Sequence, residues 1–341
     1  MVKQKKIIQA VAGSGKTTLL INKLKETKEN VVIITFTINN QEEIKNKVIE
    51  TFNGSIPSNI HIFRFFQFLY SFCVTPFMKE RPKGINFDRL PNQPYNQNIY
   101  KDINNRFYKD RISKAVLEKK EEIKYISRVD RYFSKVFIDE VQDFASDDLD
   151  WLLSLNECDA EILCVGDFYQ STFQTSARGN KNKGVKQNYD KYKKKFVDHG
   201  FKFDDMVLSK SIRCSEPTCR FIRKNLGINI YSYEKNQSDY PQLITKPDHI
   251  SKIWNDDNII KLFYQKSTDY NCSNCLNWAE SKGITRKDVC IILTKNLESM
   301  VKNEDFTSIS PVTKSKFYVA CTRASNNVYF ISSSQVKKYK K

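Results

Sequence analysis

A short block near the start of the chain has the residue types and spacing of a phosphate-binding loop. The block reads AVAGSGKTT over residues 10–18 and follows the apolar pair Ile7 and Ile8. In such a loop, glycines let backbone N–H groups converge on phosphate oxygens, a lysine reaches the β- and γ-phosphates, and a hydroxyl binds Mg²⁺. The block predicts a nucleoside triphosphate site. We expect its binding residues to be Gly13, Ser14, Gly15, Lys16, Thr17 and Thr18, with Thr17 also on the metal ion.

Two adjacent carboxylates supply groups that hydrolysis of a triphosphate needs. Asp139 and Glu140 directly follow the apolar run at 136–138. Ligands of open α/β sheets gather at the carboxyl ends of the strands, so we expect both side chains at such an end. We assign Asp139 to Mg²⁺ and Glu140 to orienting and deprotonating the attacking water. The alternative, that the two acids only cap the next helix, does not explain why the block continues with Val-Gln-Asp at 141–143.

A parallel sheet is needed to position these residues. Buried parallel strands appear as apolar runs without alternation, separated by helical stretches. Helical patterns occur at 17–28 and 40–49, and the apolar runs lie at 6–11, 31–36, 136–138, 162–165, 259–264, 289–293 and 328–331. Since 341 residues exceed one typical domain, we expect an α/β protein with two domains.

Two basic segments interrupt this pattern. Residues 76–130 are rich in Asn, Pro, Tyr and Lys, contain a basic helical portion at 109–124, and are typical of an insertion in the first domain. Residues 181–195 end in a run of lysines and precede a domain boundary that we place near residue 203. Both segments would supply non-specific phosphate contacts if they face a nucleic-acid groove.

The overall charge indicates a polyanionic partner. The chain has 56 Lys and Arg against 39 Asp and Glu, a formal net charge of +17. Nucleic acid is the first candidate and an anionic membrane surface is the rival. No apolar run approaches the roughly 20 residues of a spanning helix, and no signal peptide precedes the phosphate loop. We therefore expect a cytoplasmic protein that does not bind a membrane.

The nine cysteines are mostly placed in apolar stretches, where a reduced thiol behaves as a small hydrophobe. Only Cys272 and Cys275 form a CxxC pair. A zinc site at this pair is the less favoured interpretation, because it needs two more ligands that the sequence does not indicate.

The motifs occur in an order that resembles superfamily 1 helicases of the UvrD/Rep type. Seven blocks along the chain are similar to motifs I, Ia, II, III, IV, V and VI of that family. They read AVAGSGKTT (10–18), TFTINN (35–40), DEVQD (139–143), VGDFYQS (165–171), LSKSIRCS (208–215), SKG (281–283) and YVACTRA (318–324).

This resemblance implies two RecA-like P-loop NTPase lobes, each built on a parallel sheet, with ATP between them. The first lobe would comprise residues 1–75 and 131–203 and carry motifs I to III. Residues 76–130 would form a small, mostly helical, basic inserted subdomain. The second lobe would comprise residues 204–341 and carry motifs IV to VI.

The resemblance also implies roles for further residues. Gln170 would sense the γ-phosphate, and Arg213 and Arg323 would act as arginine fingers from the second lobe, so that hydrolysis depends on lobe closure. Nucleic acid would be contacted by Phe36, Thr37, Arg64 and Phe173, two of which offer aromatic faces for base stacking.

The chain departs from the family pattern at several points. Ile212 stands where the family usually has a tyrosine that stacks on the base, and Thr175 stands where it has a tryptophan. Motif V lacks its histidine and glutamate, and no glutamine block precedes motif I. Only about 65 residues separate motifs IV and V, which indicates a short form lacking most of the second-lobe insertion. Nucleobase selectivity stays open.

The resulting expectation is an ATP- and Mg²⁺-dependent superfamily 1 DNA translocase or helicase that moves 3′ to 5′ on single-stranded or partly duplex DNA. We expect no small-molecule substrate other than the nucleotide. Two alternatives stay open. One is a DNA-stimulated ATPase that acts as a regulatory switch for a protein partner, such as a nuclease, without processive unwinding. The other is an RNA-directed motor.

Overall fold

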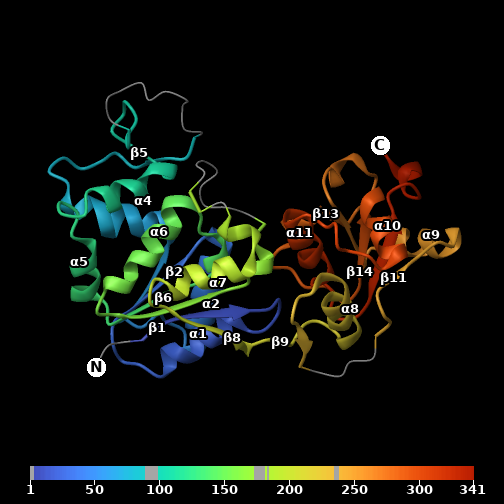
Figure 1. Cartoon of the computed structure of the whole chain (residues 1–341), viewed down its shortest axis with the longest axis horizontal. Coiled ribbons are helices and arrows are strands. Elements are labelled where there is room, and N and C mark those ends of the chain that lie inside the picture. The colour runs from blue at the N-terminus through green and yellow to red at the C-terminus, as the bar shows by residue number, and fades with distance from the viewer. Residues whose placement is uncertain (1–3, 89–98, 173–180, 183, 234–237) are drawn as a thin grey trace. The chain divides into compact units, whose positions relative to one another are not determined.

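The computed structural model describes residues 4–88, 99–172, 181–182, 184–233 and 238–341 (Figure 1). The chain divides into two compact units. Unit 1 is Met1–Gln9, Lys16–Phe168 and Phe173–Asp205, and unit 2 is Ala10–Gly15, Tyr169–Thr172 and Met206–Lys341. The phosphate loop is thus grouped with unit 2 by its contacts, although the helix that follows it belongs to unit 1.

A six-stranded sheet in the order β3-β2-β6-β7-β1-β8 organises the first part of the chain. All neighbours from β3 to β1 are parallel. Every residue of β2 is buried, which is why its sequence does not alternate. β7 lies between the strand of the phosphate loop and the strand that leads to Asp139. The strands are β1 (Lys5–Ala10), β2 (Val31–Thr35), β3 (Ile60–Arg64), β6 (Lys135–Ile138), β7 (Glu161–Gly166) and β8 (Lys202–Leu208).

The helices of unit 1 include those of the predicted insertion. α4 packs on α6 and on a π-helical turn over Phe68–Val74, and Ser113 on α4 hydrogen-bonds Asp148 on α6 at 2.5 Å. The short strands β4 (Ile85–Asn86) and β5 (Phe107–Tyr108) pair in parallel. The helices are α1 (Lys16–Lys25), α2 (Ile38–Thr51), α3 (Phe65–Gln67), α4 (Lys109–Glu118), α5 (Tyr125–Tyr132), α6 (Ser146–Ser154) and α7 (Tyr189–Val197).

Unit 2 contains a five-stranded sheet in the order β11-β15-β14-β12-β13, in which every neighbouring pair is parallel. Its strands are β11 (Gln242–Leu243), β12 (Ile260–Phe263), β13 (Cys275–Asn277), β14 (Val289–Leu293) and β15 (Val328–Ser332). The helices are α8 (Glu216–Leu226), α9 (Pro247–Asn255), α10 (Lys295–Asn303) and α11 (Pro311–Cys321). A small parallel pair joins β9 (Lys210–Ser211) to β10 (Tyr231–Ser232).

Successive residues of the second sheet face two separate apolar clusters. Leu262, Ile291 and Phe330 pack with residues of α8 and α11, whereas their neighbours Phe263, Ile292 and Ile331 pack with residues of α9. Helices therefore cover both faces of this sheet (Figure 1). The expected α/β architecture with two parallel sheets is confirmed. Within the described ranges, no helix has the length and apolar character that crossing a membrane requires.

Candidate active site

The phosphate loop connects the end of β1 to the first residue of α1. Gly13 and Gly15 have φ angles of 70° and 87°, in the left-handed region that favours glycine. The Ser14 N–H donates to the Val11 carbonyl at 3.2 Å. The Ser14 hydroxyl is buried, and no hydrogen-bond partner is found for it among the described residues. A buried hydroxyl of this kind fits a loop that receives an oxygen-rich ligand.

Three backbone groups of the loop are hydrogen-bonded within unit 2. Val11 donates to the Leu208 carbonyl, and the Gly13 carbonyl accepts from the Ile212 N–H, both at 2.9 Å. The Ala12 N–H donates to the hydroxyl of Tyr318 at 2.9 Å. The loop is therefore held by the segment of motif IV and by the helix that leads into motif VI.

Gly13 cannot be replaced without moving motif IV. A Cβ atom at this position would lie 2.6 Å from Cβ of Arg213 and 2.9 Å from the hydroxyl of Ser211, and the positive φ would be strained for any other residue. The glycine therefore has two roles, in the turn and in the close approach of the segment that carries Arg213.

The two carboxylates lie at the carboxyl end of β6, as expected. Asp139 continues the sheet through a hydrogen bond from its N–H to the Ile34 carbonyl at 2.9 Å, and it is 4% exposed. Glu140 has a left-handed backbone with φ 55°, and its N–H donates to the Asp139 carboxylate at 2.9 Å. Gln142 donates to the Glu140 carboxylate at 2.5 Å. Glu140 is thus turned out of the strand direction and oriented by its own motif.

Motifs II and III are connected through the same glutamine. The side-chain amide oxygen of Gln142 accepts the N–H of Asp167 at 2.9 Å. Gly166 makes this possible, because a Cβ atom there would overlap the Gln142 amide oxygen and lie 2.6 Å from Cγ1 of Val141. Gln142 therefore binds the Glu140 carboxylate on one side and the residue after β7 on the other.

β1 joins this network through Gln9. The Gln9 amide donates to the Asp167 carboxylate at 3.3 Å and accepts the Phe168 N–H at 3.1 Å. Gln9 and Asp167 are buried and were not among the predicted site residues. The sequence does contain a signal for Gln9, which is a polar residue inside the apolar run Ile-Ile-Gln-Ala of β1. Buried polar groups generally have hydrogen-bond partners, so a polar residue at such a position indicates a specific contact.

The donor set fits Mg²⁺. This ion prefers hard oxygen ligands and is usually held by one or two protein groups together with substrate phosphates. A buried carboxylate at Asp139 and the Thr17 hydroxyl at the start of α1 are such groups. The Thr35 hydroxyl at the end of the adjacent β2 is also buried, with no hydrogen-bond partner found among the described residues. In the described part of the chain, no group of three or more His, Cys, Asp or Glu side chains could hold a metal ion. The CxxC pair is therefore not joined by further ligands of these types within those residues.

The two predicted arginine fingers meet at Thr322. Arg213 donates to the Thr322 carbonyl at 3.3 Å, and Arg323 donates to the Thr322 hydroxyl at 3.1 Å. Arg323 is 1% exposed and also donates to the carbonyls of Val319 at 2.9 Å and of Ser281 at 3.4 Å. Motifs IV and V thus both contact motif VI, at Thr322 and at Arg323 respectively. The approach of both arginines to Lys16 stays a prediction.

Ser211 and Cys214 shape the turn that carries Arg213. The buried Ser211 hydroxyl accepts the N–H groups of Arg213 at 3.2 Å and Cys214 at 3.0 Å. A hydrogen bond from the Cys219 thiol, together with Ser211 and the nearby arginine charges, lowers the pKa of Cys214. Gln170, the predicted γ-phosphate sensor, is buried at 4% exposure directly after Tyr169 in unit 2.

Three of the predicted nucleic-acid residues lie at one end of the first sheet. Arg64 ends β3 and is the register partner of Thr35, the residue before Phe36. Arg64 is exposed, and Phe36 contacts Phe66 edge-on at a centroid distance of 6.0 Å. The Thr37 hydroxyl caps α2 by accepting the Asn40 N–H at 3.1 Å. Phe173 and Thr175 lie outside the described residues.

Phe66 and Phe87 extend this surface, and Phe87 was not predicted. Phe66 contacts Phe87 at 5.8 Å, and Phe87 is 60% exposed. The run Phe-Arg-Phe-Phe at 63–66 has the composition of a nucleic-acid contact, but an apolar strand-to-helix segment has the same composition. Only the fold shows which ring faces outward.

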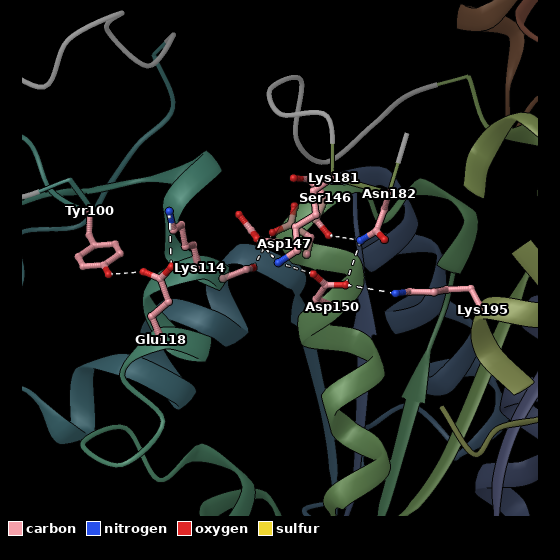
Figure 2. Close-up of polar contacts among 11 residues, drawn as sticks. Tyr100, Lys114, Glu118, Ser146, Asp147, Asp150, Lys181, Asn182 and Lys195 are labelled. Carbon is pink, nitrogen blue, oxygen red and sulfur yellow. Dashed lines mark hydrogen bonds and ion pairs between the residues drawn. The ribbon is translucent and has the colours of Figure 1, made fainter. Parts of the chain in front are cut away.

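Basic residues of the 181–195 segment are paired with carboxylates. Figure 2 shows Lys181 bonded to Asp147 at 3.0 Å and to Asp150 at 2.6 Å, with Lys195 at 3.9 Å from Asp150. The hydrogen bond to Asp150 raises the pKa of Lys181. Asn182 completes the attachment by donating to Asp150 at 2.9 Å. The charges of Lys181 and Lys195 thus attach the segment to α6. For these two lysines the structure does not support the expected phosphate contacts.

A second pairing in Figure 2 involves α4 of the insertion. Tyr100 donates to Glu118 at 2.5 Å, and Lys114 lies 3.5 Å from the same carboxylate. The bond to Glu118 raises the pKa of Tyr100 to about 12. Part of the positive charge of the insertion is thus also neutralised locally.

Comparisons with known proteins agree with this arrangement. Residues 1–100 match the UvrD/REP helicase N-terminal domain, and residues 96–332, more than half of the chain, match the viral superfamily 1 RNA helicase core domain. No curated protein matches the chain.

Solved structures of similar fold include two of an arterivirus protein. The crystal structure of Arterivirus nonstructural protein 10 (helicase) is 14% identical with a TM-score of 0.53, and covers 98% of this chain and 62% of that one. The structure of that helicase in complex with DNA is 13% identical with a TM-score of 0.51, and covers 96% and 60%. The chain thus spans less than two thirds of the length of these helicases, and at such identity the likeness shows the fold alone. The match of the family model over residues 96–332 places the chain in the superfamily 1 helicases.

Proposed function

We propose that the chain is an ATP-dependent translocase or helicase that moves 3′ to 5′ on single-stranded DNA. The observation that supports this most is the convergence of Arg213 and Arg323 on Thr322, in the same unit that holds the phosphate loop. Paired guanidinium groups of this kind neutralise charge at a transferring phosphoryl group.

In this proposal, each requirement of hydrolysis is met by its own residues. The loop N–H groups and Lys16 bind the phosphates, Thr17 and Asp139 hold Mg²⁺, and Glu140 orients and deprotonates water. The metal ion, when bound, neutralises phosphate charge. Gln142 holds Glu140 in its left-handed turn, so the base is preorganised before substrate arrives.

The same hydrogen-bond network would couple ATP hydrolysis to movement along a nucleic-acid strand. Motif III runs from Asp167, bound to Gln142, to Gln170, the proposed γ-phosphate sensor. Phe36, Thr37 and Arg64, at the end of β2 and β3, would contact the strand. A structural change at the ATP phosphates would reach the bound nucleic acid through the adjoining ends of these β-strands.

RNA is the second candidate strand. The family whose model matches is described as an RNA helicase core, whereas one similar structure is a complex with DNA. The ATPase rate measured without polynucleotide, with single-stranded DNA and with single-stranded RNA, across a salt series, decides between them. A rate that ignores both polymers would overturn the proposal.

Movement and switching need separate measurements. Displacement of streptavidin from oligonucleotides biotinylated at either end reports directional movement, and 3′- or 5′-tailed duplexes report unwinding polarity. Stimulated ATPase activity without displacement would favour the regulatory switch. Lys16→Ala serves as the control without hydrolysis, since it removes the lysine that reaches the phosphates.

A further inference from the structure

Two lysines of α11 each lie over the ring of a tyrosine from another segment of unit 2. The Lys314 ammonium is 5.6 Å from the ring centroid of Tyr169, and the Lys316 ammonium is 4.5 Å from that of Tyr264. All four side chains are partly exposed. We call these residues the α11 surface.

The charge of the α11 surface is not balanced by any acid that the structure describes. Among the described residues, neither Lys314 nor Lys316 forms an ion pair, in contrast to Lys181 and Lys195 of unit 1. Burial lowers the pKa of Lys314. A partly buried ammonium without a carboxylate is unfavourable unless an anion binds there, so the arrangement fits an anionic ligand.

The fold places this surface where ligands of parallel sheets bind. Tyr264 directly follows β12, so it stands at the carboxyl end of a central strand. It packs edge-on against the buried Trp278 at 5.4 Å, and Trp278 donates to the Leu262 carbonyl at 2.9 Å. Tyr264 is therefore fixed to the sheet rather than attached to a loop.

Tyr169 connects the same surface to motif III. It precedes Gln170 and contacts Tyr318 edge-on at 6.1 Å. Lys314 and Tyr318 are one helical turn apart, on one face of α11. Tyr318 hydrogen-bonds the phosphate loop, so Lys314 lies about 6 Å further along the helix, in the direction away from Arg323.

We propose that Lys314, Lys316, Tyr169 and Tyr264 form a contact surface for the backbone phosphates and bases of a single-stranded nucleic acid. The inference rests on the proposed function and assigns to unit 2 a strand contact that the motifs do not indicate. Cations beside aromatic faces are the combination by which single strands are bound without sequence preference. Because Tyr169 adjoins Gln170, a strand on this surface is next to the proposed γ-phosphate sensor.

The salt dependence of binding tests the proposal, since each phosphate contact on a single strand contributes about 0.7 to the slope of log K against log salt. Fluorescence anisotropy with labelled dT20 and rU20, from 50 to 200 mM salt, measures it for the full chain. For Lys314→Gln/Lys316→Gln we expect the slope to fall by about 1.4, so the wild-type protein loses roughly sevenfold more affinity than the variant over this range. Lys314→Arg/Lys316→Arg keeps the charges and should keep the slope.

The matched control is Lys252→Gln. Lys252 is exposed on α9, which covers the opposite face of the second sheet (Figure 1), and we expect wild-type binding from it. Tyr264→Leu should weaken binding with an unchanged slope, because stacking is lost while charge is kept.

Two results would overturn the inference in different ways. If the wild-type protein binds the oligonucleotides and the double Gln variant has the same slope as Lys252→Gln, the α11 surface is not a strand contact and the proposed function stands. If the wild-type protein binds neither oligonucleotide, the proposed function fails and the inference fails with it. Melting temperatures of the variants show whether a loss of binding reflects unfolding.

Discussion

Gly166 is the position where one added methyl group should separate catalysis from binding. It ends β7, and a Cβ atom there would overlap the amide oxygen of Gln142 and lie 2.6 Å from Cγ1 and 3.0 Å from the backbone nitrogen of Val141. Its φ angle is not positive, so alanine is allowed by the backbone and the conflict is purely steric. Gly166→Ala must therefore push the 139–143 turn away from β7.

The size of the effect follows from this geometry. Overpacking of a buried site costs about 1–3 kcal/mol. For a unit of this size, each kcal/mol lowers the unfolding midpoint by roughly 2–4 °C, so we expect a fall of about 2–12 °C. The displaced turn carries Glu140, and a shift of about 1 Å in a catalytic group can reduce the rate by about 10²-fold. Binding of ATP through the phosphate loop should change much less.

The assay combines kcat for ATP hydrolysis, the dissociation constant for ATP and the thermal midpoint. Gly184→Ala is the matched control, since Gly184 has φ −68° and an added methyl group there would meet no described atom within 4 Å. Removing a glycine at a compatible site changes stability by less than about 1 kcal/mol. If Gly166→Ala hydrolyses ATP at the wild-type rate with an unchanged midpoint, contact between motifs II and III does not position Glu140.

Three further predictions concern other parts of the molecule. Glu140→Gln should lower kcat by about 10²–10⁴-fold while ATP still binds, as checked by equilibrium titration; normal hydrolysis would refute its role as base. Tyr318→Phe removes the acceptor of the Ala12 N–H and should lower the free energy of unfolding by about 1–3 kcal/mol in urea titrations; an unchanged value would mean that the tether is not needed. Asp150→Asn should destabilise the chain by up to about 1 kcal/mol at low salt and by less at 1 M salt. Because the pKa of Lys181 is raised, the contribution of its ion pair to stability is complete at pH 7 and is lost as pH rises above 10.5 and through the folded pKa of Lys181. A stability difference between the wild-type protein and Asp150→Asn that stays constant up to pH 11 would contradict this.

Local sequence was sufficient for the groups that act through their own backbone. The phosphate loop depends on glycines and a lysine within nine residues, and a strand followed by Asp139 and Glu140 needs only an apolar run to bring it to the sheet edge. Non-alternating apolar runs likewise predicted the parallel sheets, because a strand buried on both faces must be apolar throughout.

The roles of charged residues could not be predicted in the same way. Lys181 and Lys314 look alike in the sequence, as lysines within basic stretches. In the structure Lys181 is neutralised by Asp147 and Asp150, whereas Lys314 lies over an aromatic ring and forms no ion pair with an acid of the described ranges. Their difference depends on carboxylates brought close by folding, which no local pattern records.

Tertiary structure also decided how the catalytic blocks support one another. Gln9 reaches Asp167 across 158 positions of the chain, and Arg213 meets Thr322 across 109. The sequence determined which chemical groups are present and which strand or loop carries each of them, since propensity and periodicity are local. Which groups share a hydrogen bond was decided by strand order and helix packing, because side chains separated by more than a hundred residues meet only when the sheets have formed.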